Sequence, residues 1–260
     1  MSSEQILYSV KEKVAYISFN RAPANAYNLH FYEQFHTYVA QANQDDKVGA
    51  VVINSTSERF FCAGADIKEF QQNSTAENKK MVMRARKALA AIEASSKIFI
   101  AQIAGHCLGG GLEIAMACDI RFASTGSYQF GLPEVKLGLM PGNGGTQRLL
   151  KLVGYSKAIE ILSLGNTFDA EEAYRWGLLN RLSDVENLHT QTFEFATSVA
   201  NGPLLAVAAT KKALSRGTEL PLTEGLQLEK ELCDSLYDTH DGKEGFLAFV
   251  EKRNPVFTGN

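Results

Sequence analysis

Four short apolar runs in the first half of the chain have the length of β-strands and end at turn-forming residues. They cover residues 13–19, 49–54, 97–104 and 119–123. Between them, apolar residues recur at helical spacing over residues 29–43 and 76–94. This alternation of strands and helices predicts an α/β fold for the first part of the chain.

The pattern changes to mainly helical from about residue 156. Asp169 and Glu172 have the spacing of a capping box, and Gly177 follows as a stop signal. Pro203 and Pro221 are each placed to open a helix, and these helices are expected to end near residues 216 and 238. No Pro- or Ser-rich linker separates the two parts, so two independent domains are not required.

Composition and charge are those of an ordinary globular protein. The chain has 260 residues, of which 45% are hydrophobic and 21% charged. A chain of this length can bury roughly three-quarters of the surface it exposes when unfolded. The formal net charge of −3 offers no general attraction for nucleic acid, so we expect no nucleic-acid partner.

Cysteine use and the N-terminal residues predict a cytoplasmic protein with reduced thiols. The four cysteines, Cys62, Cys107, Cys118 and Cys233, lack the paired spacing of metal ligands, so no metal site is expected. Residues 1–5 do not resemble the start of a secretory signal. No apolar run approaches the ~20 residues of a membrane span, so we expect no membrane insertion.

The most informative segment is a glycine-rich turn at residues 104–113, which follows a predicted strand and opens a helix expected over residues 112–118. Consecutive glycines let a ligand approach the backbone, and N–H groups at a helix N-terminus favour negative charge. The turn therefore has the properties of an oxyanion hole. A close crossing of helix and strand would explain the glycines equally well.

Two acidic residues follow this turn. Glu113 lies in the first turn of the predicted helix, and Glu134 follows Pro133 in a loop. Together they provide a pair for acid–base chemistry. Each also has an ordinary structural explanation, because the helix dipole favours an acidic residue at position 113 and loops commonly carry solvated carboxylates.

These motifs, with the small-residue turn at residues 60–69, closely resemble those of the crotonase superfamily, specifically the enoyl-CoA hydratases. The resemblance runs from residues 14–19 to residues 249–253. It implies a spiral of ββα units over residues 1–195 and a helical C-terminal trimerisation region over residues 196–260, both part of one functional unit. It also suggests a homohexamer built as a dimer of trimers.

The resemblance assigns roles to four residues of the predicted site. The N–H groups of Ala65 and Gly110 would bind a thioester oxygen while charge develops on it. Glu134 would be the principal acid–base group at the α-carbon, and Glu113 would orient or activate water at the β-carbon. Close carboxylates titrate as a coupled pair.

For the CoA part of a substrate, the resemblance implies two loops and a C-terminal segment. The matching residues are Asn25 and Ala26 in the first loop, Ala63, Asp66, Ile67 and Lys68 in the second, and Phe249 and Lys252 near the C-terminus. The C-terminal pair would often serve a neighbouring subunit. A solvent-facing helical lysine is the plain alternative for Lys252.

Four positions depart from the usual family pattern, among them Ala104, where asparagine is frequent. The first loop lacks a common lysine, so a phosphate contact there would require Arg21 to replace it. His106 lies beside the glycines, and we favour a structural role for it because the glutamates already supply acid–base chemistry. Asn143 stands where alanine is frequent, and would either contact water or substrate or fit a turn.

The resulting prediction is an enoyl-CoA hydratase that adds water reversibly to a trans-2-enoyl-CoA and gives a 3-hydroxyacyl-CoA. It needs no metal or redox cofactor, since CoA is part of the substrate. The alternatives are a Δ3,Δ2-enoyl-CoA isomerase and a noncatalytic protein that binds CoA esters or acts as a scaffold. The GxGxxG and GxSxG motifs are absent, which disfavours a Rossmann oxidoreductase and a serine hydrolase.

Overall fold

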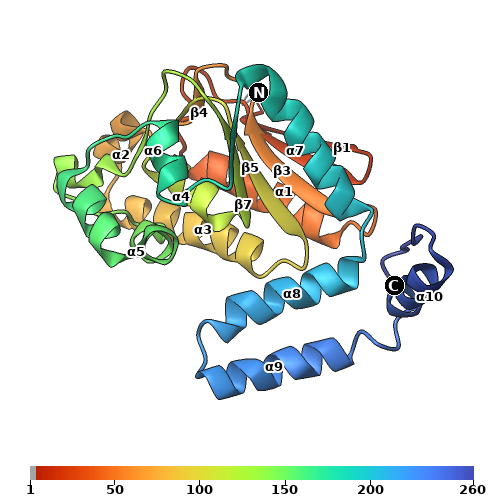
Figure 1. The fold of residues 1–260 in the computed structure, drawn as a ribbon. Coiled ribbons are helices and arrows are strands. Elements are labelled where there is room, and N and C mark those ends of the chain that lie inside the picture. Colours follow the sequence, from red (N-terminus) through yellow and green to blue (C-terminus); the bar gives the residue numbers. More distant parts are fainter. Residues whose placement is uncertain (1–3) are drawn as a thin grey trace.

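The larger of two sheets has six strands in the order β1-β2-β3-β5-β7-β9 in the computed structural model, which describes residues 4–260 (Figure 1). The strands are β1 (Ile6–Lys11), β2 (Val14–Phe19), β3 (Ala50–Ser55), β5 (Ile98–Ile103), β7 (Ile120–Ser124) and β9 (Arg181–Ser183). The β1–β2 pair is antiparallel, and every later pair is parallel.

The smaller sheet is parallel and has the order β4-β6-β8. Its strands, β4 (Phe60–Cys62), β6 (His106–Leu108) and β8 (Phe130–Gly131), follow β3, β5 and β7 respectively along the chain. Each pair of strands leads into helical structure. These helices are α2 (Ile67–Gln72) and α3 (Thr75–Glu93), then α4 (Gly110–Ala117), then the 3-10 helix η1 (Pro133–Leu137) and α5 (Gly145–Leu164). The expected spiral of ββα units is therefore confirmed.

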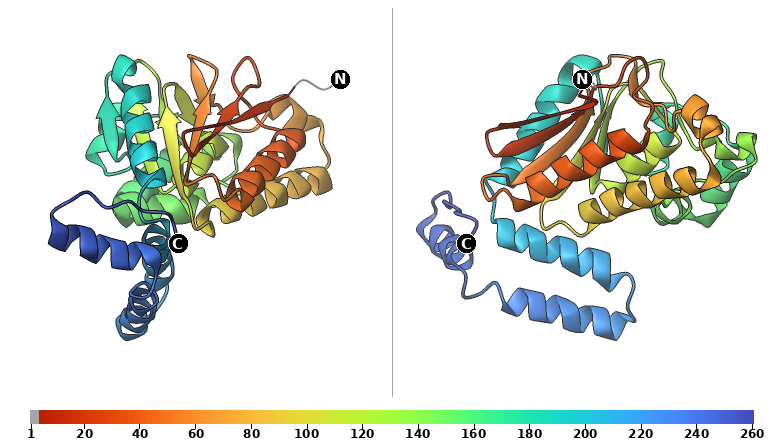
Figure 2. Two further views of the ribbon diagram at one scale, coloured as in Figure 1. Left: turned by 90° about the vertical axis from the view of Figure 1, so that its right-hand side faces the viewer. Right: turned by 180° about the vertical axis from the view of Figure 1, so that it is seen from behind.

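Helices cover both faces of the larger sheet (Figure 2). Val51 and Ile53 of β3 face the core formed with α1 (Leu29–Gln44) and α3, whereas Ala50 and Val52 pack with α7 (Val185–Ala200). Because both faces are buried there, the first four residues of β3 are all apolar rather than alternately apolar and polar.

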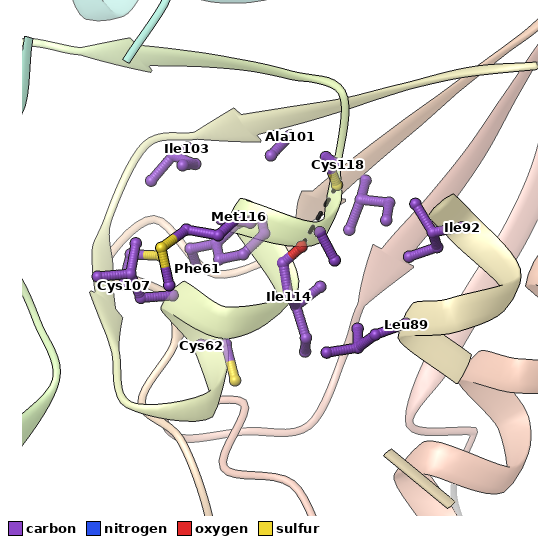
Figure 3. Packing of buried hydrophobic residues seen from close by; sticks show 14 of the residues in the cluster. Phe61, Cys62, Leu89, Ile92, Ala101, Ile103, Cys107, Ile114, Met116 and Cys118 are labelled. Carbon is purple, nitrogen blue, oxygen red and sulfur yellow. Dashed lines mark hydrogen bonds between the residues drawn. The ribbon is translucent and has the colours of Figure 1, made fainter. Parts of the chain in front are cut away.

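Helix α4 is enclosed by the core, and all of its residues are buried. Ile114 points toward Leu89 and Ile92 of α3, while Met116 lies beside Cys107 of β6 (Figure 3). A helix packed on all sides has little freedom to shift. The core therefore fixes the N-terminus of α4, where the glycine-rich turn lies.

The last three helices leave the body of the molecule (Figures 1 and 2). They are α8 (Leu204–Gly217), α9 (Leu222–Asp234) and α10 (His240–Glu251). Helix α9 has no buried residue within this chain. The division predicted at residue 195 falls inside α7, which packs on the sheet as far as Ala200, so the departure from the body begins at α8.

Most elements with a strong local pattern lie where the sequence predicts them. The four predicted strands are observed with ends shifted by about one residue, and α6 (Ala170–Arg175) has the expected capping box. The helices after Pro203 and Pro221 begin as expected, but α9 ends at Asp234, before the predicted position near 238. The sequence did not predict β1, which is largely exposed, or β9 and the strands of the smaller sheet, which have only two or three residues.

Lys211 ties α8 to the body through a buried ion pair. Its Nζ donates to Asp119 Oδ2 at 2.8 Å and to the carbonyls of Ile92 and Lys97 at 3.0 and 2.9 Å. The Lys211 side chain is only 7% exposed. Removal of this cation would leave the Asp119 carboxylate, whose surroundings are largely buried, without its partner.

We expect Lys211→Met to lower the free energy of unfolding by about 3–5 kcal/mol, because it leaves an uncompensated buried charge. Urea unfolding would measure this loss. Lys212→Met provides the matched control, since Lys212 is exposed on the same helix and should change stability by less than about 0.5 kcal/mol. Equal effects of the two substitutions would contradict the anchoring role.

Candidate active site

The smaller sheet brings the predicted chemical groups together, because each group follows one of its strands. Ala65 follows β4, Gly110 follows β6, and Glu134 follows β8. The strands are parallel, so their carboxyl ends meet at one edge. A Cβ added to Gly64 would lie 3.5 Å from Gly110 N, and one added to Gly109 would lie 3.2 Å from Glu134 Oε1.

The two predicted oxyanion donors have no competing acceptor. Tyr27 forms an isolated β-bridge with the backbone at Ala65, through the Gly64 carbonyl and the Asp66 N–H, which leaves the Ala65 N–H unused. Gly110 is the first residue of α4, where N–H groups lack intrahelical acceptors. Within residues 4–260, neither N–H donates a hydrogen bond to the protein.

Glycine is required at the turn for conformational reasons. Gly109 has φ of 53° and Gly64 has φ of 93°, which are values that other residues rarely adopt. At Gly110 the reason is space, because a Cβ would lie 2.2 Å from the Tyr27 hydroxyl oxygen. Glycine is therefore needed at these positions, where the segments that carry Gly64, Gly110 and Tyr27 approach one another closely.

Glu113 is almost fully buried, at 1% exposure. Its Oε1 accepts hydrogen bonds from the backbone N–H groups of Asn143 at 2.7 Å and Gly145 at 2.8 Å. Burial raises the pKa of Glu113, while these two N–H groups and the nearby Arg148 oppose the rise. The hydrogen bonds fix one carboxylate oxygen and leave the other available.

Glu134 lies in η1, directly after Pro133. Burial raises its pKa to about 7, and the charge of Glu113 adds to the rise. Its Oε2 is buried and has no hydrogen-bond partner within residues 4–260. A carboxyl group that titrates near neutral pH is well suited to both giving and taking a proton.

We expect the raised pKa of Glu134 to reduce stability as pH rises from about 4.5 to about 7. The unfolded chain loses this proton first, so in this range the folded state binds more protons and higher pH favours unfolding. The penalty is complete above about pH 7. The shift corresponds to about 3 kcal/mol at most, and partial exposure lowers the expected effect to roughly 1–2 kcal/mol.

Urea unfolding of Glu134→Gln and the unsubstituted protein at pH 5 and pH 8 would test this expectation. The variant should gain about 1–2 kcal/mol relative to the unsubstituted protein between the lower and the higher pH. Glu58→Gln, an exposed loop substitution, should show no such gain. A pH-independent difference for Glu134→Gln would contradict the raised pKa.

The first of the predicted CoA loops is held by a buried asparagine. Asn25 is 1% exposed, and its side-chain amide donates to Ser55 Oγ and to the carbonyls of Phe60 and Phe61. It also accepts from Arg21 N, and the backbone of Asn25 has φ of 51°. The Asn25 side chain therefore shapes the loop, and the half-buried Ala26 is the more accessible neighbour.

Arg21 connects this first loop to the second. It forms an ion pair with Asp66 at 2.8 Å and donates to the Ala26 carbonyl. The Arg21 hydrogen bond lowers the pKa of Asp66, which also caps α2. The guanidinium is thus already paired within the protein, which weakens the idea that it replaces the missing lysine as a phosphate contact.

The remaining residues of the second loop lie at the surface beside the candidate oxyanion hole. Ala63 is half-buried, whereas Ile67 and Lys68 are exposed at the start of α2. These residues are thus accessible next to Ala65. Their backbone follows the same turn that presents the Ala65 N–H.

Phe249 and Lys252 are not brought to this site within one chain. Phe249 lies on α10 and is 85% exposed, and Lys252 ends that helix with φ of 56°. Helix α10 lies apart from α2 and α4 (Figures 1 and 2). A contact between these two residues and CoA therefore requires another subunit.

His106 belongs to β6 and lies against the Phe60 ring, with 5.1 Å between ring centroids. Its Nδ1 accepts from the Gln129 N–H at 3.1 Å. Burial and then Arg59 lower the pKa of His106, which favours the neutral ring that can accept this bond. These contacts support a structural role.

Sequence reasoning missed Tyr27. It is 7% exposed, its hydroxyl accepts from Asn143 Nδ2 at 3.2 Å, and its ring lies beside Gly110. The only signal was its position next to Asn25 and Ala26 in a loop already assigned to the site. No local pattern relates Tyr27 to residues so distant in the sequence.

Residues 4–260 contain neither a membrane-spanning helix nor a cluster of metal-ligating side chains. No helix there is long and apolar enough to span a bilayer. No group of three or more His, Cys, Asp or Glu side chains in that range has an arrangement that could hold a metal ion.

Comparisons with known proteins identify the family of this chain. Residues 9–260 match the family model described as enoyl-CoA hydratase/isomerase. The short-chain-enoyl-CoA hydratase of Clostridium acetobutylicum is 36% identical over 97% of both chains, and the crotonyl-CoA hydratase of Syntrophomonas wolfei is 36% identical over 99% of both. A solved enoyl-CoA hydratase structure from Geobacillus kaustophilus has a TM-score of 0.96 at 35% identity, covering 100% of this chain and 98% of that one. This chain therefore belongs to the enoyl-CoA hydratase/isomerase family.

Proposed function

We propose that this protein is an enoyl-CoA hydratase that adds water reversibly to a trans-2-enoyl-CoA and gives a 3-hydroxyacyl-CoA. The observation that carries the proposal is the meeting of two carboxyl groups, Glu113 and Glu134, with the unused N–H groups of Ala65 and Gly110. Curated relatives named as hydratases over nearly the full chain support it.

The chemistry follows from the positions of these groups. The Ala65 and Gly110 N–H groups bind the thioester oxygen and stabilise the charge that develops as water adds. Glu113 takes a proton from the water, whose oxygen bonds to C3, while Glu134 gives its proton to C2. The two carboxyl groups then exchange protons with solvent, which restores the starting state. No electrons are gained or lost overall, so the proposal requires no redox cofactor.

Hydration of crotonyl-CoA tests the proposal directly. We expect loss of the conjugated enoyl absorbance and formation of 3-hydroxybutanoyl-CoA. Conversion of a 3-enoyl-CoA without hydration of crotonyl-CoA would instead support the isomerase alternative. Binding of CoA esters without turnover of either substrate would support the noncatalytic alternative.

We further propose that the protein assembles as a homohexamer of two trimers through the helical C-terminal part. The support is apolar exposure: α9 has no buried residue, and Phe249 and Val250 of α10 are 85% and 77% exposed. Such surface on helices that leave the body is expected to be covered by another subunit. Cytoplasmic location remains a prediction from the sequence.

Light scattering would test this assembly, and CoA titration of Lys252→Ala would test its role in the site. We expect a mass of about six chains and weaker CoA binding by the variant. Lys230→Ala is an exposed control on α9 that should bind CoA normally. A fully active monomer whose CoA affinity is unchanged by Lys252→Ala would contradict both parts.

A further inference from the structure

Tyr27 and Asn143 form a buried polar pair at the candidate active site. Asn143 is 3% exposed and Tyr27 is 7% exposed, and the Asn143 amide donates to the Tyr27 hydroxyl at 3.2 Å. Buried polar groups are costly unless they are hydrogen-bonded. The bond between them satisfies Asn143 Nδ2 but leaves Asn143 Oδ1 without a partner within residues 4–260.

Each member contacts a part of the proposed machinery. The Asn143 backbone N–H donates to Glu113 Oε1 at 2.7 Å. Tyr27 pairs with the backbone at Ala65, and its hydroxyl lies where a Cβ on Gly110 would be. The pair thus lies between the carboxylate proposed to activate water and the N–H groups proposed to bind the thioester oxygen.

The Asn143 side chain is not needed to hold its own loop. The backbone N–H groups of Asn143 and Gly145 already bind Glu113, and the Asn143 carbonyl accepts from Arg148 at 2.6 Å. These bonds involve only main-chain atoms of residue 143. An alanine at this position would keep all of them. The amide adds two further interactions, a favourable one with the Glu113 carboxylate that lowers its pKa and the hydrogen bond to Tyr27.

The side-chain oxygen of Asn143 can still accept a hydrogen bond. Asn143 Oδ1 is buried and has no hydrogen-bond partner within residues 4–260. Burial and then the Glu113 carboxylate raise the pKa of Tyr27 well above its ordinary value, so the hydroxyl keeps its hydrogen. The hydroxyl oxygen accepts from Asn143 Nδ2 at 3.2 Å, so this bond directs the Nδ2 end of the amide toward Tyr27 and the Oδ1 end away from it. Tyr27 thereby sets which way the amide points.

We propose that Asn143 Oδ1 accepts one hydrogen of the reacting water while Glu113 takes the other, and that Tyr27 is a positioning residue that fixes the Asn143 amide. The inference rests on the proposed hydratase function. A water molecule has two hydrogens to place, and two acceptors hold its oxygen in one orientation toward C3. The bonds made and broken in the proposed hydration stay the same, because Asn143 neither gains nor loses a proton.

The test compares two reactions in Asn143→Ala, Tyr27→Phe and the double variant. Hydration of crotonyl-CoA needs the oriented water, whereas deuterium exchange at C2 of butanoyl-CoA needs only Glu134 and the oxyanion hole. We expect Asn143→Ala to lower kcat for hydration about 10-fold, with KM and C2 exchange nearly unchanged. Tyr27→Phe should act in the same direction but less strongly.

The double variant distinguishes positioning from independent effects. If Tyr27 acts through Asn143, Tyr27→Phe should have no further effect on hydration in the Asn143→Ala background. Gln147→Ala removes an exposed amide near the start of α5 and should leave both reactions unchanged. The proposal would be overturned if the fold-losses of the two single variants multiplied in the double variant. Equal losses in the rates of hydration and C2 exchange would also overturn it.

Failure of this inference and failure of the proposed function are separate outcomes. If the unsubstituted protein does not hydrate crotonyl-CoA, the function itself is wrong. If it does and both single variants hydrate at the full rate, only the role of the pair is wrong. Thermal melting first establishes that each variant folds. Should Asn143→Ala not fold, the ratio of hydration to exchange in Tyr27→Phe decides, and an unchanged ratio overturns the proposal.

Discussion

Glu134→Gln is expected to lower the rate of crotonyl-CoA hydration by at least ~100-fold while CoA-ester binding stays nearly unchanged. The amide preserves the shape of the side chain but cannot give a proton to C2. The Glu134 carboxyl group has a pKa of about 7, so the substitution removes a group that can exchange protons near neutral pH. Initial rates and a titration with a saturated CoA ester would measure the two effects.

Glu113→Gln is the matched comparison. Glu113 is assigned to the water, so this variant should also lose hydration but retain more of the C2 proton exchange than Glu134→Gln does. Near-normal turnover by a folded Glu134→Gln protein would remove its assigned role. Equal loss of exchange in both variants would contradict the division of labour between the two carboxyl groups.

Gly110→Ala is expected to reduce hydration by about 100-fold or more, which corresponds to the loss of one oxyanion donor. The added Cβ would lie 2.2 Å from the hydroxyl oxygen of Tyr27 and 2.6 Å from its Cζ, and Tyr27 is only 7% exposed. Neither the ring nor the start of α4 has room to accommodate it. The Gly110 N–H must therefore move away from the thioester oxygen.

The informative measurement is the affinity of folded Gly110→Ala for two ligands, a saturated CoA ester and an enolate-like CoA analogue. Interactions that assist catalysis strengthen toward the transition state, so the analogue should lose more affinity. Gly217→Ala is the control, because a Cβ there meets no atom within 4 Å. Equal losses for both ligands would indicate general damage to the pocket and contradict the oxyanion role.

Local patterns were sufficient for elements whose own residues carry the signal. The strand β3 begins with four consecutive apolar residues, and α6 has its cap and stop residues within nine positions, from Asp169 to Gly177. Short strands such as β8, with two residues, carry too little pattern to be recognised. Their existence depends on neighbours supplied by distant parts of the chain.

The sequence by itself determined the α/β order and the glycine turn, because these depend on residue type and short-range spacing, and its resemblance to the family identified the paired glutamates. The tertiary structure alone decided that burial brings the pKa of Glu134 to about 7. It also decided that Asn25 and Arg21 are engaged within the protein, and that Tyr27 meets Asn143 across 116 residues. The physical reason is that hydrogen bonding, desolvation and close packing depend on which distant segments the parallel strands bring to one edge.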